Sequence, residues 1–92
     1  IARAIAIEPA LLLFDEPLVR VYKAQLAAGN NINFPLSKAG YLVISTGNAS
    51  LTFQTGGIIQ QRLMKAGHYC WLNEASTVTS NTSANLLILQ LK

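Results

Sequence analysis

Two adjacent carboxylates, Asp15 and Glu16, come directly after the apolar run of residues 11–14. A short apolar run is typical of a buried strand, and such a strand delivers the residues that follow it to one edge of a sheet. Mg²⁺ and an attacking water can be held there, as nucleotide hydrolysis requires. The pair therefore makes nucleotide hydrolysis the first activity to consider.

The segment 2–18 closely resembles the Walker B region of ATP-binding-cassette transporter ATPases. The resemblance implies that Asp15 holds the metal and that Glu16 polarises the water. ATP binding also needs a glycine-rich phosphate cradle followed by a lysine, and no lysine of this chain stands in that context. We therefore expect Asp15 and Glu16 to be inactive, and a fragment of such an ATPase is the alternative.

Few other residues can do chemistry. After residue 18 the chain has one histidine, His68, one carboxylate, Glu74, and one cysteine, Cys70. A tight mononuclear metal site takes three or four protein ligands, and paired-carboxylate catalysis takes two acids. Two residues separated by one on a strand share a face without necessarily being in contact, which weakens a Cys70–His68 nucleophile. We expect His68 to lie in a turn and Cys70 to be a buried apolar residue, and we predict no catalytic residue, metal or cofactor.

Four aromatic residues are the remaining candidates for a binding site: Tyr41, Phe53, Tyr69 and Trp71. Aromatic side chains usually form the core of a small barrel, but they can also line a ligand cavity. A small-molecule-binding barrel with an unknown ligand is therefore a further alternative.

The composition indicates one small globular domain. Of the 92 residues, 51% are hydrophobic and 12% are charged, which argues against disorder. No apolar run approaches the roughly 18 residues of a membrane helix, so we predict no membrane partner. The basic residues are dispersed and not interleaved with aromatic residues, so we predict no nucleic-acid partner either. A single cysteine fits a reducing compartment, which predicts a cytoplasmic protein.

The balance of charge changes at residue 18. Residues 1–18 contain one basic and three acidic residues, whereas residues 19–92 contain six basic residues and one acidic residue. The change coincides with the end of the Walker B resemblance. We therefore divide the chain into an N-terminal arm, residues 1–18, and a second domain, residues 19–92.

From residue 19 onward, runs rich in β-branched and aromatic residues alternate with turn residues at a spacing of about 8–12, as in sandwiches and barrels. The expected strands are 19–26, 32–36, 41–46, 49–53, 58–64, 69–72, 77–79 and 86–91. Gly47 and Asn48 separate two of these runs, so we expect a hairpin there. The pattern predicts an all-β sandwich or barrel.

The order of these parts resembles a cupin, the small jelly-roll barrel, and more narrowly the C-terminal cupin domain of pirin-like proteins. Residues 21–29, 40–51, 63–69 and 86–91 carry the resemblance. It implies a metal site built from histidines and a carboxylate inside the barrel, yet residues 33–53 contain no His, Asp, Glu or Cys. The resemblance therefore implies the fold without the metal chemistry, as in the pirin-like C-terminal domain.

These observations predict a small, all-β, cupin-like jelly-roll barrel with an N-terminal apolar arm. We expect a non-catalytic structural or interaction domain. Burying the four apolar side chains of residues 11–14 is worth roughly 6–12 kcal/mol, at about 1.5–3 kcal/mol each. We therefore expect the arm to pack on the barrel or to add to a sheet edge, and we predict a homodimer.

Overall fold

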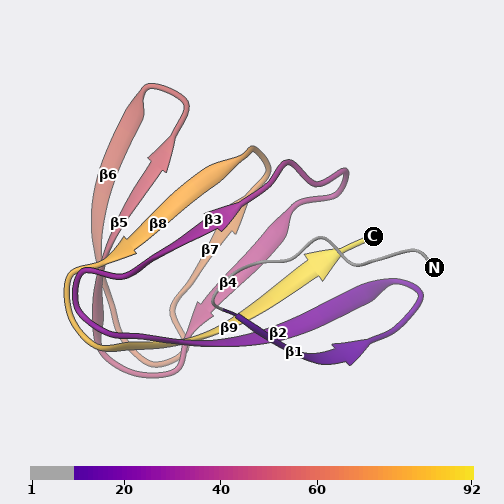
Figure 1. The fold of residues 1–92 in the computed structure, drawn as a ribbon, viewed down its shortest axis with the longest axis horizontal. Coiled ribbons are helices and arrows are strands. Elements are labelled where there is room, and N and C mark those ends of the chain that lie inside the picture. Colours follow the sequence, from indigo (N-terminus) through magenta and orange to yellow (C-terminus); the bar gives the residue numbers. More distant parts are fainter. Residues whose placement is uncertain (1–9) are drawn as a thin grey trace.

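The computed structural model describes residues 10–92, whose nine strands form two antiparallel sheets (Figure 1). Sheet A has the strand order β1-β2-β9-β4-β7, and sheet B has the order β3-β8-β5-β6. The strands are β1 (Leu11–Asp15), β2 (Val19–Leu26), β3 (Asn31–Phe34), β4 (Tyr41–Ser45), β5 (Ala49–Thr55), β6 (Ile58–Met64), β7 (Tyr69–Leu72), β8 (Ser76–Ser80) and β9 (Ala84–Leu91). None of the described residues forms a helix that is long and apolar enough to cross a membrane.

The core lies between the two sheets and follows the two-residue period of the strands. In β4 the inward side chains are Tyr41, Val43 and Ser45, and each of them is buried. The buried hydrophobic residues are Tyr22, Ala24, Leu26, Ile32, Phe34, Tyr41, Val43, Ala49, Leu51, Phe53, Met64, Leu72, Val78, Ala84, Leu86 and Ile88. The all-β prediction is confirmed, because alternation of apolar and polar residues is the signal that specifies a strand with one buried face.

One polar pair lies within this core. Gln90 is buried on β9, and the hydroxyl of Tyr22 on β2 donates a hydrogen bond to its Oε1 at 3.0 Å. The two strands run antiparallel side by side in sheet A. The bond satisfies an amide oxygen whose burial without a partner would be costly.

The hairpin predicted at Gly47 and Asn48 is wrong. Strand β4 pairs with β7 and β9 in sheet A, whereas β5 pairs with β6 and β8 in sheet B. Tight two-residue hairpin turns need positive φ at one or both central residues, and neither Gly47 nor Asn48 has it. The chain instead crosses from one sheet to the other there. The β5–β6 hairpin forms at Gly56, whose φ is +60°.

Strand β1, which belongs to the N-terminal arm, forms one edge of sheet A (Figure 1). Residues 1–9 lie outside the described residues, and β1 pairs antiparallel with β2, with a shift in register between Leu12 and Phe14. The expectation that the arm adds to a sheet edge is therefore confirmed. Its apolar side chains are not covered, because those of Leu11, Leu12, Leu13 and Phe14 keep between 40% and 65% of their surface exposed.

Candidate functional site

A small pocket lies between β6 and β7, which are free edges of the two different sheets. Its volume is about 180 Å³. Phe53 of β5 supplies aromatic surface and Arg62 of β6 supplies a cationic group. Trp71 borders the pocket from β7, a strand whose inward side chains are Cys70 and Leu72. The open edges of the two sheets thus enclose a site with both apolar and polar walls.

The structure brings together two of the four aromatic residues that were candidates for lining a pocket. Phe53 and Trp71 line the pocket between β6 and β7. Tyr41 lies instead in the core, where only 1% of its surface is exposed and its hydroxyl donates to the backbone oxygen of Pro35 at 2.7 Å. Burial raises the pKa of the Tyr41 phenol above its ordinary value of 10.0. Tyr69 is 67% exposed and lines a separate surface hollow, so Tyr41 and Tyr69 do not contribute to this pocket.

The ring of Trp71 packs closely against Gly40. Gly40 has a φ of +89°, and a Cβ atom there would lie 2.8 Å from the backbone oxygen of Leu72 and 3.3 Å from the Trp71 ring. The ring therefore covers a backbone position where no side chain fits. Trp71 stands on the face of β7 opposite the buried Leu72, so this contact lies on the outer face of sheet A.

Arg62 is the residue that the sequence reasoning did not single out. Its guanidinium carbon lies 5.9 Å from the centroid of the Phe53 ring, and its Nη2 donates to Oε1 of Gln60 at 3.3 Å. Alternation along β6 places Arg62 and Gln60 on the same face as the buried residue Met64. The two-residue spacing between Arg62 and Met64 is the sequence signal that identifies Arg62 as a residue on the inner face of β6.

The Walker B-like residues lie at the edge of sheet A, where Asp15 is engaged by cations of its own chain. Oδ1 of Asp15 accepts a hydrogen bond from Nζ of Lys92 and another from Nε of Arg20, the latter at 3.2 Å. The hydrogen bond from Lys92, aided by both positive charges, holds the pKa of Asp15 below its ordinary value of 3.8. Glu16 forms the following turn, where its backbone N–H donates to the carbonyl of Val19 at 2.8 Å.

The other residues that could do chemistry, His68 and Cys70, lie at and just before β7. His68 lies in the turn before β7, where its Nδ1 accepts from the backbone N–H of Lys65 at 3.2 Å. Cys70 is half-buried, packs against the core and also lines the pocket. Within residues 10–92, no three His, Cys, Asp or Glu side chains lie close enough together to hold a metal ion.

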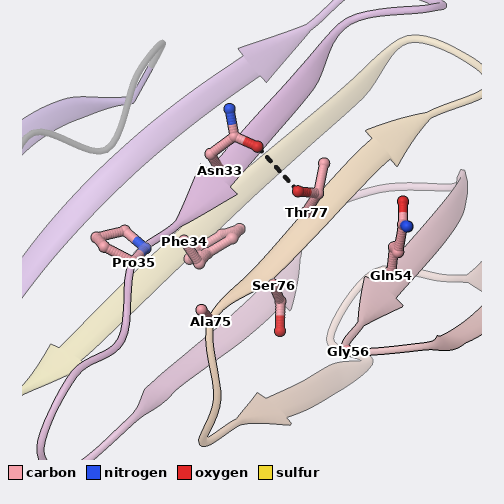
Figure 2. Close-up of a pocket in the computed structure, with 8 residues that line it drawn as sticks. All are labelled: Asn33, Phe34, Pro35, Gln54, Gly56, Ala75, Ser76 and Thr77. Carbon is pink, nitrogen blue, oxygen red and sulfur yellow. Dashed lines mark hydrogen bonds between the residues drawn. The ribbon is translucent and has the colours of Figure 1, made fainter.

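A second, wider hollow of about 520 Å³ lies at the end of sheet B (Figure 2). Asn33 and Thr77 point toward one another there, and the Thr77 hydroxyl donates to Oδ1 of Asn33 at 2.9 Å. Gln54 and Ser76 also line it, and none of its lining residues is charged. The hollow is lined by amide and hydroxyl groups, some of which are already hydrogen-bonded to one another. None of its lining side chains titrates near neutral pH.

Comparisons with known proteins find likeness in structure and none in sequence. No protein-family model matches the chain, and no curated protein matches it. A cupin domain from Bordetella pertussis Tohama I is similar, with a TM-score of 0.73 and 16% identity over 97% of this chain and 99% of that one. A cupin superfamily protein from Desulfitobacterium hafniense DCB-2 has a TM-score of 0.71 and 10% identity over 99% of this chain and 82% of that one.

An enzyme is also among the similar structures. Streptomyces albus HEPD, solved with its substrate 2-hydroxyethylphosphonate and Fe(II) bound, has a TM-score of 0.66 and 11% identity, over 88% of this chain and 20% of that one. At these identities the likeness establishes the fold and leaves the activity to be argued from the site. The chain therefore has the fold of a small cupin jelly-roll barrel, as its sequence predicted.

Proposed function

We propose that this chain is a non-catalytic interaction domain with the cupin fold, and that it pairs with a second copy of itself through β1. The observation that carries the proposal is the uncovered apolar edge of sheet A. Leu11, Leu12, Leu13 and Phe14 stand on a strand whose outer backbone edge has no neighbouring strand within the described residues. Such an edge is a ready template for pairing with another chain.

The free energy gained by covering the apolar side chains of β1 is comparable to the free-energy cost of bringing two chains together. About half of the surface of these four side chains is exposed, so covering it is worth about 3–6 kcal/mol per copy, half of the value for full burial. Two copies together gain roughly twice that, against about 4–15 kcal/mol for the lost freedom of two bodies. We therefore expect a dimer whose population depends on protein concentration.

Matched substitutions test the pairing. Phe14→Lys places a charge on β1, and Ile58→Lys makes the same change at the exposed start of β6. Sedimentation equilibrium should show weaker self-association for Phe14→Lys, and unchanged association for Ile58→Lys. Equal weakening by both substitutions would mean that added charge, not the β1 surface, controls association, and the proposal would fall.

The absence of catalysis in this proposal is supported by the distribution of the reactive groups. Asp15 is already bonded to Lys92 and Arg20, so a metal ion would have to displace both cations. A fragment of an ATP-binding-cassette ATPase therefore remains the less favoured alternative. The likeness to the pirin-like C-terminal domain rests on the order of sequence segments alone, and we propose it on that basis. We propose a cytoplasmic location because the chain has a single cysteine, which fits a reducing compartment.

A second candidate function, a small-molecule-binding barrel, is favoured by one observation. Phe53 of sheet B and Cys70 and Leu72 of sheet A border one pocket, which the edges β6 and β7 leave between them. Apolar walls with a few polar groups are the usual composition of a ligand site. This candidate does not compete with pairing through β1, because β1 and β7 are opposite edges of sheet A.

A further inference from the structure

We propose that the pocket between β6 and β7 binds a short hydroxycarboxylate, with Arg62 as the group that receives the carboxylate. The proposal rests on the second candidate function and names the chemical class of its ligand. It assigns no metal and no reaction to the pocket.

Among the described residues, Arg62 is a cation without a carboxylate partner. Within residues 10–92 the ion pairs are those of Asp15 with Arg20 and with Lys92, and neither involves Arg62. A guanidinium presents a planar fork of donors that matches a carboxylate in two parallel hydrogen bonds. An unpaired arginine that lines a pocket is therefore suited to an anion from solution.

The guanidinium is also held in position before any ligand arrives. It lies over the ring of Phe53 at 5.9 Å from the centroid, and one of its nitrogen atoms donates to Gln60. Contact with the face of an aromatic ring stabilises a cation, and a donor fixed in advance loses less entropy on binding. The remaining N–H groups of Arg62 stay available for an anion.

A pair of hydroxyl groups on another part of the pocket wall is placed to bind the hydroxyl group of the ligand. The oxygens of Thr55 and Ser76 are 2.8 Å apart, and both residues line the pocket. The Ser76 hydroxyl donates to the backbone oxygen of Glu74 at 3.0 Å, so its single proton is used. The Thr55 hydroxyl is then the donor within the pair, and its lone pairs can accept a hydrogen bond from a ligand hydroxyl.

The volume of the pocket limits the size of the ligand. The pocket has a volume of about 180 Å³. Pockets for drug-sized molecules are larger, about 300–1,000 Å³. A carboxylic acid of a few carbon atoms with one hydroxyl group fits this space, whereas a nucleotide does not.

Lactate and its neutral analogue lactamide provide the test, because they differ in charge and hardly in shape. Trp71 borders the pocket between the inward residues Cys70 and Leu72 of β7, so the NMR shift of its backbone N–H reports binding. We expect lactate to shift this signal in a saturable way, and lactamide at matched ionic strength to leave it unchanged. Propionate, which lacks the hydroxyl, should bind more weakly than lactate.

Two substitutions with the same change in charge identify the cation. Arg62→Gln should weaken lactate binding about tenfold or more, as the loss of a charged hydrogen bond predicts. Lys65→Gln, at the residue directly after the end of β6 and outside the pocket lining, should leave it unchanged. Arg62→Lys keeps the charge but removes the planar fork, so we expect intermediate binding. The amide spectra of all three variants, recorded without ligand, show whether the fold is intact.

Each other outcome overturns a defined part of the proposal. Equal binding of lactate and lactamide would refute selection of an anion and leave the ligand-binding barrel standing. Equal loss in Arg62→Gln and Lys65→Gln would refute Arg62 as the receiving group. If neither lactate, propionate nor lactamide moves the Trp71 signal at millimolar concentrations, both the hydroxycarboxylate and the ligand-binding barrel are wrong, while pairing through β1 is unaffected.

Discussion

Replacing Gly40 by alanine should destabilise the barrel through two separable effects. The first is conformational, because Gly40 has a φ of +89°, and an L-residue in a left-handed conformation costs about 1–2 kcal/mol. The second is steric, because the new Cβ would lie 2.8 Å from the backbone oxygen of Leu72 and press on Trp71. Forcing atoms into a packed site costs about 1–3 kcal/mol. The expected loss is therefore about 2–5 kcal/mol.

Gly29→Ala is the matched control for this change. Gly29 has the same φ of +89°, but a Cβ there meets no atom within 4 Å. Both substitutions restrict the unfolded chain equally, so that contribution cancels between them. Gly29→Ala should lose only the conformational part, about 1–2 kcal/mol, and the two variants should differ by about 1–3 kcal/mol.

Urea unfolding at equal protein concentration, followed by far-ultraviolet circular dichroism, measures both free energies. The emission of Trp71 should change in Gly40→Ala and not in Gly29→Ala, because only the former Cβ contacts its ring. Equal free energies of unfolding for the two variants would refute the close approach of Leu72 and Trp71 to Gly40.

Two further predictions concern polar contacts. Tyr22→Phe leaves the buried Oε1 of Gln90 without its donor, so it should lower the free energy of unfolding by about 1–3 kcal/mol. The control, Tyr69→Phe, changes an exposed tyrosine and should have almost no effect. Equal effects of the two substitutions would contradict the buried hydrogen bond. Asp15, bonded to Lys92, has a pKa below 3.8, so its contribution to stability is present above pH 3.8 and is lost as the pH falls through the lower folded-state pKa. Asp15→Asn should therefore lower the free energy of unfolding at neutral pH, and the difference from the unmodified chain should shrink in acid. Urea titrations at several pH values measure this difference, and a difference that does not change with pH would refute the prediction.

Most strands could be predicted because their signal is local. The bounds of Val19–Leu26, Ile58–Met64 and Tyr69–Leu72 agree with the sequence prediction to the residue. Strand-forming runs bounded by turn residues such as Gly56 and Gly67 are visible within the local sequence, so no knowledge of the strand partners is needed. The strand expected at 32–36 ends at Phe34, because Pro35 cannot donate to a ladder.

Strand partners were harder to predict, because pairing depends on contacts far apart in the sequence. Gly47 and Asn48 have the composition of a hairpin turn, but their backbone conformation sends β5 into the other sheet. The choice is made by the partners of β5, which are β6 and β8. A two-residue motif does not contain that information.

The candidate site could be predicted only in part for the same reason. Phe53 and Trp71 were identified as aromatic residues that can line a pocket, but Tyr41 and Tyr69 have the same composition signal and lie elsewhere. Arg62 was not identified, although alternation places it with Met64 on the inner face of β6. Arg62 is a candidate site residue only because β6 and β7 border the same pocket, and the complete topology is needed to place these two strands together.

The mass of the unmodified chain in solution tests the central proposal most directly. Light scattering across a range of concentrations should show a mass that rises from 9.9 kDa, the mass of one chain, toward twice that value. The rise should be absent in Phe14→Lys, whose charge lies on the uncovered edge of sheet A. A mass of 9.9 kDa at every concentration up to about 1 mM, where an association free energy of about 4 kcal/mol would already be visible, would contradict pairing through β1.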